Sequence, residues 1–191
     1  MNIPDAIEIA VAVAVTAALV WASVTDVRQR RIPNLCVAIL LALFVAWSVA
    51  ALGAHLISGL EAGAIALVLT VALWAGGVFG AGDSKLFAAV ALFMGLGYLP
   101  YFAVATALAG GGLAVISLAR NPTRALAIFT LRGKGDSGPG VPYGVAIGMG
   151  GALVLWAMLT GWLLPYGYGQ PPRPTVHNIE RSLAGGHPWG V

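Results

Sequence analysis

Residues 79–99 read F-G-A-G-D-S-K-L-F-A-A-V-A-L-F-M-G-L-G-Y-L, and they decide how the rest of the chain is arranged. An acid, Asp83, and a base, Lys85, stand two positions apart, directly before an apolar run at 86–99. At about fourteen residues this run is short for a membrane crossing, so it fits either a full crossing or a re-entrant segment. The choice sets the side on which every later segment lies.

The composition of the whole chain is strongly apolar. Of its 191 residues, 59% are hydrophobic and only 9% are charged, and the mean hydropathy is +0.89. These values lie far outside the usual mix for soluble domains and indicate an integral membrane protein with short loops. The formal net charge of +3 is too small to suggest a nucleic-acid partner. The lipid bilayer is the expected surrounding.

Six apolar runs lie near the length that a bilayer core requires, and only the fourth is doubtful because it is short. They lie at approximately 7–24, 35–53, 60–79, 86–99, 101–119 and 142–164. The first run is preceded by Asp5 and Glu8 rather than by basic residues, which argues against a signal peptide. The sequence therefore predicts an all-α membrane protein with six transmembrane helices.

The basic residues set the predicted orientation, because Lys and Arg accumulate on the cytoplasmic side of a membrane. If all six runs cross, the cytoplasmic segments hold Arg28, Arg30, Arg31, Lys85, Arg120, Arg124, Arg132 and Lys134. A re-entrant segment at 86–99 would move the last four of these residues outside, so the charges favour a full crossing. The N-terminus and the C-terminus are then both expected outside the cytoplasmic membrane.

Two regions are expected along the chain, a six-helix transmembrane domain at 1–165 and a tail at 166–191. The tail mixes Pro, Gly and polar residues without a period, which favours an external disordered segment. His177 and His187 in this tail are better explained as solvated side chains than as metal ligands.

A single cysteine, Cys36, excludes a disulfide within the chain and a Cys-rich zinc site. Neither a metal nor a cofactor is predicted.

Two acids are expected to share the cytoplasmic face, because Asp26 ends the first run and Asp83 precedes the fourth. A lone acid at a helix end is often a solvated boundary residue, but ionisable groups at membrane depth are costly and therefore functional candidates. Paired aspartates suit peptide hydrolysis, since like charges a few ångströms apart hold one proton between them. The ionised partner can take a proton from water while the protonated partner donates to the scissile carbonyl.

Gly80 and Gly82 stand directly before this second acid. Without Cβ atoms they let the chain turn sharply and let a peptide backbone approach the acid. Their simpler role is to separate two helices, and the stretch matches neither a phosphate-binding loop nor a dinucleotide fingerprint.

Three motifs together carry a family resemblance. They are D-V-R-Q-R-R-I-P-N at 26–34, G-A-G-D-S-K at 80–85 and V-P-Y-G-V-A at 141–146. In this order the motifs closely resemble those of the type IV prepilin peptidases, a group of the GxGD membrane aspartyl proteases. The resemblance implies a GxGD aspartyl protease fold with Asp26 and Asp83 as the catalytic pair. As supporting residues it suggests Gly80, Gly82, Lys85, Pro142, Tyr143 and Gly144.

The same resemblance implies the substrate and the partners. Such enzymes cleave the short basic leader of prepilins at the cytoplasmic face, and the pilus assembly machinery is a further expected partner. The larger members carry an additional domain with paired Cys-x-x-Cys motifs and methylate the new N-terminus, which one cysteine cannot supply. The chain is similar to the short peptidases of Flp-type pilus systems, so we predict cleavage without methylation.

Helix ends suggest a division of roles between the acids. Asp26 is expected near the negative C-terminal end of the first helix and Asp83 near the positive N-terminal end of the fourth, so dipoles favour Asp83 as the base and Asp26 as the acid. Basic residues nearby stabilise either anion, which leaves the order open. Asn34 is predicted as the N-cap of the second helix.

Other readings of the same residues remain. Ser84 and Lys85 could act as nucleophile and base, although adjacent helical residues diverge, and Asp83 could pair with Asp136 in the Gly-rich loop. A small transporter or proton pathway would also use membrane acids, but it should carry them at the bilayer midplane. A non-catalytic component of a pilus or secretion machine would tolerate substitution of both acids.

Overall fold

The computed structural model describes residues 6–51, 53, 55–77, 79–120 and 143–165. Within these ranges every regular element is a helix, and no strand is present. The helices are α1 (Ala6–Gln29), α2 (Asn34–Ala50), α3 (Leu56–Ala75), α4 (Ala81–Arg120) and α6 (Tyr143–Leu159). The predicted all-α class is therefore confirmed, whereas the expected tail at 166–191 and most of the loop before α6 lie outside the described residues.

Several helices fit a membrane. Within the described ranges, α1, α3 and α4 are long and apolar enough to cross a bilayer, and α2 and α6 are shorter apolar helices of 17 residues each. Seventeen residues lie at the lower limit of what a spanning helix requires. The chain is therefore a membrane protein, and six crossings stay a prediction.

The helix α4 corrects the expected boundary between the fourth and fifth runs. The sequence suggested a break near Pro100, but the helix breaks at Gly95, with φ 60° and ψ 178°. A positive φ is accessible to glycine at little cost, and a Cβ here would lie 2.8 Å from the Ser58 hydroxyl. That hydroxyl accepts the Leu96 N–H at 3.1 Å and so caps the helix that follows the break.

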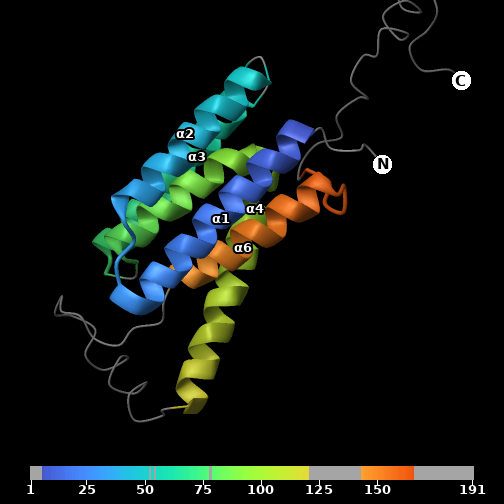
Figure 1. The fold of residues 1–191 in the computed structure, drawn as a ribbon. Coiled ribbons are helices and arrows are strands. Elements are labelled where there is room, and N and C mark those ends of the chain that lie inside the picture. Colours follow the sequence, from blue (N-terminus) through green and yellow to red (C-terminus); the bar gives the residue numbers. More distant parts are fainter. Residues whose placement is uncertain (1–5, 52, 54, 78, 121–142, 166–191) are drawn as a thin grey trace, which may run out of the picture.

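The break divides α4 into a first arm, residues 81–94, and a second arm, residues 96–120. In Figure 1 the first arm runs alongside α3, and the second arm turns back and leaves the bundle at an angle. Pro100 therefore lies within the second arm and not at the break.

The start of α2 corrects a second expectation. Asn34 is not the N-cap but the first helical residue, and Pro33 holds the N-cap position without a side-chain hydrogen bond. The extended backbone of Pro33, with φ −63° and ψ 133°, suits an N-cap, and its carbonyl accepts the Cys36 N–H at 3.0 Å.

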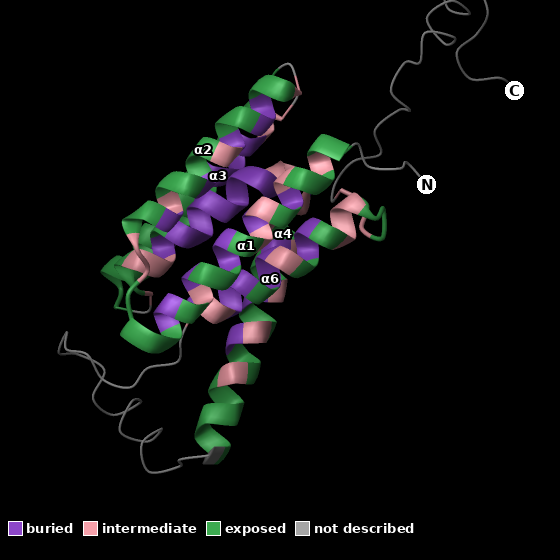
Figure 2. Ribbon diagram, viewed as in Figure 1, coloured by how far each residue is buried: buried purple, intermediate pink, exposed green. Residues whose placement is uncertain are grey.

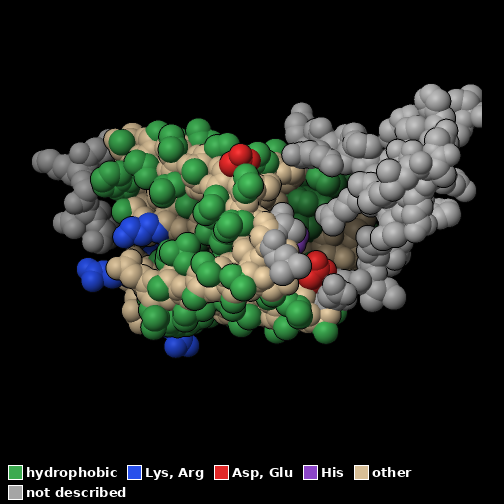
Figure 3. All heavy atoms as spheres, turned by 90° about the horizontal axis from the view of Figure 1, so that it is seen from above, with side chains coloured by type: hydrophobic (Ala, Val, Ile, Leu, Met, Phe, Trp, Pro, Cys, Tyr) green, Lys and Arg blue, Asp and Glu red, His purple; other side chains and the backbone are tan. Residues whose placement is uncertain are grey.

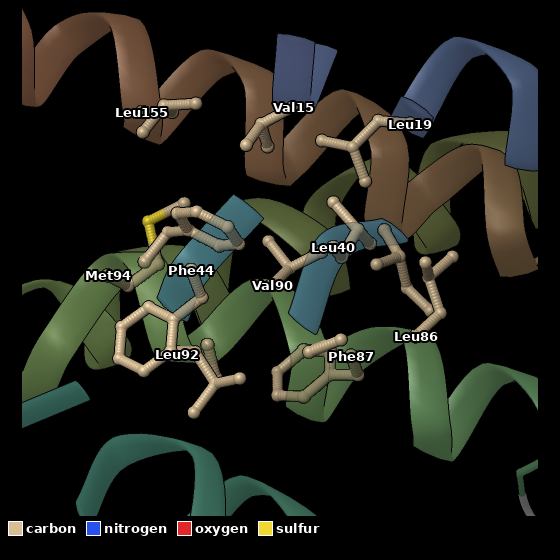
Figure 4. Close-up of a cluster of buried hydrophobic side chains, with 14 of the residues drawn as sticks. Val15, Leu19, Leu40, Phe44, Leu86, Phe87, Val90, Leu92, Met94 and Leu155 are labelled. Carbon is tan, nitrogen blue, oxygen red and sulfur yellow. The ribbon is translucent and has the colours of Figure 1, made fainter. Parts of the chain in front are cut away.

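The interior is a cluster of apolar side chains from all five described helices. Figure 4 shows Val15 and Leu19 of α1 facing Leu40 of α2, Val90 of α4 and Leu155 of α6. Figure 2 shows the buried residues along the lines where the helices meet and exposed residues on the outer faces. Many exposed side chains are nevertheless large and apolar, such as those on the outer face of α3, as expected for a surface in contact with lipid.

The few charged side chains are unevenly distributed. Figure 3 shows a face covered mostly by apolar side chains, with Lys and Arg gathered toward one end. The described basic side chains stand at the end of α1 and the start of α4, at Arg28, Arg30, Arg31 and Lys85. Basic residues thus mark the end of the bundle at which the two acids of interest lie.

Candidate active site

Asp26 lies in the last turn of α1 and is buried. Its carboxylate oxygen Oδ2 accepts the backbone N–H of Gly144 at 2.8 Å, from the first turn of α6. Because this hydrogen bond comes from another helix, the packing of α6 against α1 sets the orientation of the Asp26 carboxylate. Because free N–H groups at a helix start attract anions, this carboxylate lies at a favourable place on α6.

The contact depends on the close approach of α6 to α1. A Cβ built on Gly144 would lie 2.8 Å from Oδ2 and 3.0 Å from the Cβ of Asp26. One turn earlier on α1, the Ser23 hydroxyl donates to the Leu19 carbonyl at 2.8 Å and approaches the Gly144 carbonyl at 3.3 Å. A Cβ on Gly148 would collide with the same hydroxyl. Small residues on one face of α6 therefore let the two backbones meet, as in other membrane helix pairs.

Asp83 occupies the third position of α4, and it is oriented by the start of its own helix. The backbone N–H of Gly80 donates to the Asp83 carboxylate, and the Gly80 carbonyl accepts the Ser84 N–H at 3.0 Å. An acid that reaches back from the third position to the N-cap N–H forms half of a capping box. A Cβ on Gly80 would lie 2.5 Å from Oδ2 of Asp83, so a side chain here would displace the carboxylate.

The structure brings Asp26 and Asp83 together. The two carboxyl groups are close enough to interact electrostatically. Figure 1 shows the C-terminal end of α1, the start of α4 and the start of α6 at the same end of the bundle. Each acid is therefore held by a backbone N–H of a different segment, Asp26 by α6 and Asp83 by its own first turn.

Arg30 follows Asp26 by one turn and takes an unusual backbone conformation. Its φ is 53°, in the left-handed region, and its N–H donates to the Asp26 carbonyl at 2.9 Å, which closes α1. Its guanidinium interacts electrostatically with the Asp26 carboxylate. The helix-end argument for the acid and base roles is therefore incomplete, because Asp26 also faces the positive end of α6 and an arginine.

The other candidate residues are less closely tied to the acids. Gly82 packs against Ile32. A Cβ added to Gly82 would lie 3.5 Å from the Cβ of Ile32, which is an ordinary contact distance. Lys85 is exposed. The Tyr143 ring is half-buried with its centroid 5.4 Å from that of Phe79, and Pro142 lies outside the described residues.

The serine alternative fits the geometry poorly. The Ser84 hydroxyl is buried and shares its one proton between the carbonyls of Thr70 at 3.1 Å and Gly80 at 3.0 Å, whereas Lys85 is exposed. Asp136, the other alternative, lies outside the described residues. Among the residues that are described, no group of three or more His, Cys, Asp or Glu side chains could hold a metal ion.

Sequence reasoning missed two residues around the acids, namely Ser23 and Thr70. Ser23 had a usable signal, because a residue three positions before Asp26 shares its helix face. Thr70 had none, since its contact with Ser84 depends on how α3 and α4 pack.

Comparison with known proteins supports one family. The model of the type IV leader peptidase family matches residues 13–115, which is more than half of the 191 residues and includes both acids. No curated protein and no solved structure matches the chain. The chain belongs to the type IV leader peptidase family and is an aspartic protease of the hydrolase class.

Proposed function

We propose that Asp26 and Asp83 are the catalytic pair with which this enzyme removes the short basic leader of prepilins. The observation that carries the proposal is that the end of α1 and the start of α4 bring the two carboxyl groups close enough to interact electrostatically. The family match supports a leader peptidase and extends over both residues. Their roles as catalysts rest on this geometry together with the chemistry of paired acids.

The chemistry needs one shared proton. The ionised carboxylate takes a proton from a water molecule, whose oxygen attacks the scissile carbonyl while the protonated carboxyl donates to the carbonyl oxygen. Collapse of the tetrahedral intermediate breaks the C–N bond, and the amine leaves with a proton from the acids. The sum is one water added across one amide bond, with no covalent enzyme intermediate.

The backbone contacts suit this chemistry. The Gly144 N–H holds one oxygen of Asp26 and the Gly80 N–H holds Asp83, so both carboxyl groups are oriented before the substrate arrives. Groups that are already oriented require little rearrangement in the transition state, which is a large part of enzymatic rate enhancement.

We further propose six crossings, with the site at the cytoplasmic face and both termini outside. The concentration of Arg28, Arg30, Arg31 and Lys85 at the same end of the bundle supports this orientation. In this arrangement residues 1–165 form the membrane domain and residues 166–191 an external tail. A substrate whose leader lies in the cytoplasm and whose apolar helix lies in the bilayer would place its junction at this depth.

The enzyme matures Flp-type prepilins without methylating them and works beside the pilus assembly machinery. The single cysteine supports this, because the sequence contains none of the paired Cys-x-x-Cys motifs that the methylating members carry. Mass spectrometry of pilin matured by this enzyme alone should show an unmodified new N-terminus. A methyl group that depends on this chain would contradict the assignment.

The central experiment replaces each acid by its amide. Co-expression of a prepilin with Asp26→Asn or Asp83→Asn should leave the leader in place on a gel, whereas Glu61→Gln, which neutralises an exposed acid of α3, should process normally. Full processing by either Asp variant would refute the catalytic pair. Equal membrane levels of all variants exclude loss of protein as the cause.

A further inference from the structure

We propose that Ser84 and Thr70 act together as positioning residues for Asp83. Their side chains join the start of α4 to α3, and we call these paired contacts the Ser84–Thr70 clasp. The inference rests on the proposed catalytic role of Asp83 and adds two residues, one of them on a helix that carries neither acid.

The clasp consists of reciprocal contacts between hydroxyls and carbonyls. The Ser84 hydroxyl donates to the Thr70 carbonyl at 3.1 Å, and the Thr70 hydroxyl approaches the Ser84 carbonyl at 3.5 Å. Each hydroxyl also has a carbonyl within its own helix, Gly80 at 3.0 Å for Ser84 and Ala66 at 2.7 Å for Thr70. Each hydroxyl proton can therefore be shared between its own helix and the neighbouring helix.

Both hydroxyls of the clasp are buried, which raises the energetic cost of losing their hydrogen bonds. Ser84 is 3% exposed and Thr70 is 4% exposed, so water does not replace a lost partner at low cost. Elsewhere in the described part of the chain, the buried hydroxyls of Ser48 and Thr106 have no hydrogen-bond partner. Buried hydroxyls are thus not always satisfied in this bundle, and the clasp hydroxyls differ in linking two helices.

The clasp lies at the last buried position of α3 before the chain continues to the start of α4. Thr70 is the last buried residue of α3, and residues 71–77 are all exposed. Beyond the end of α3, Gly77 has a φ of 70°, and an added Cβ there would meet nothing within 4 Å. The connection to α4 is therefore loosely packed at this point, and the contact at Ser84 fixes the start of α4 from the side of α3.

Asp83 is the residue next to the clasp. Its carboxylate is held by the Gly80 N–H, and the Gly80 carbonyl is also an acceptor for the Ser84 hydroxyl. Loss of the clasp lets the first turn of α4 rotate, which moves Asp83 relative to Asp26. Misplacement of a catalytic group by about 1 Å can cost roughly 10²-fold in rate, so a positioning contact is visible in kcat.

The test measures cleavage of a prepilin by purified enzyme in detergent, per folded molecule. Ser84→Ala and Thr70→Val each remove one hydroxyl, and we expect about a tenfold fall in kcat with little change in KM. Each variant removes one of the two hydroxyl–carbonyl contacts and keeps the backbone carbonyl that accepts the other, so the double variant should lose more activity than either single one. Ser84→Thr and Thr70→Ser keep a hydroxyl and should restore most of the rate, and Ser48→Ala, a buried hydroxyl without a partner, is the matched control.

Each result decides the inference. Unchanged kcat in both single variants, or reduced folding with unchanged kcat per folded molecule, would overturn it. Loss of activity in Ser84→Ala with full activity in Thr70→Val would also overturn it, since a nucleophilic serine needs no partner on α3. Asp83→Asn in the same assay separates the two proposals, because an active Asp83→Asn enzyme refutes the proposed function itself.

Discussion

At the scale of single residues, the two acids are distinguished by what holds them. Asp26 receives its hydrogen bond from a different helix, whereas Asp83 receives its bond from the residue that begins its own helix. The position of Asp26 therefore depends on the packing of α6, and that packing depends on glycine. Sequence motifs could predict the two acids, but they could not show that Gly144 contacts Asp26 directly.

The first residue-scale prediction concerns Gly144→Ala. The new methyl group would stand 2.8 Å from the Asp26 oxygen, so either α6 or the carboxylate must shift, and we expect kcat to fall by roughly 10²-fold. Gly111→Ala is the matched control, because a Cβ there meets nothing within 4 Å. Rates are measured on purified, folded enzyme with a prepilin substrate. Full activity of Gly144→Ala would show that this contact is not needed.

The second residue-scale prediction concerns Arg30, whose guanidinium stabilises an ionised Asp26. Arg30→Asn removes the charge while asparagine tolerates the left-handed backbone, with φ 53° in the native chain. Without the cation the pair of acids holds its proton more firmly, so the acidic limb of the pH–activity profile moves to higher pH. Arg30→Lys should keep the native profile, and Arg31→Asn is the charge control. An unmoved profile in Arg30→Asn would exclude this role.

At the scale of elements, apolar runs predicted where the helices lie better than where they break. The runs are long and strongly apolar, so the positions of the helices follow from hydrophobicity. The break in α4 was misplaced because Pro100 is the stronger local signal, while Gly95 needs Ser58 of α3 to cap the chain that follows. A cap supplied by another helix has no local signature. The same limit applies to Thr70, whose role depends on the packing of α3 against α4.

The element-scale prediction is that Gly95→Ala destabilises the bundle. An alanine at φ 60° and ψ 178°, a backbone region that essentially only glycine occupies, costs on the order of 1–3 kcal/mol, and its methyl group would lie 2.8 Å from the Ser58 hydroxyl that caps Leu96. Gly112→Ala on the second arm has open space and should be neutral or slightly stabilising. Thermal unfolding in detergent should show a lower midpoint for Gly95→Ala alone. Equal midpoints for the two variants would contradict the importance of the break.

At the scale of the whole molecule, the site exists only if the end of α1 and the start of α4 lie on one side of the membrane. Charge placement predicted this from the sequence, and the bundle brings the two acids together. The number of crossings depends on how the short helices α2 and α6 and the two arms of α4 sit in lipid. The arrangement depends on how well the length of each helix matches the thickness of the bilayer. Amino-acid composition alone does not determine that match.

The topology can be tested with cysteines that leave every charge in place. In a Cys36→Ala background, Gln29→Cys and Ala81→Cys introduce exposed thiols beside the two acids, and Leu164→Cys places one after α6. An impermeant thiol reagent should label Leu164→Cys in intact cells and should label the other two only after the membrane is opened. Labelling of Gln29→Cys and Ala81→Cys from opposite sides would separate Asp26 from Asp83 by the bilayer. No shared proton could then pass between them, and the proposed chemistry would fail whatever the activity of the enzyme.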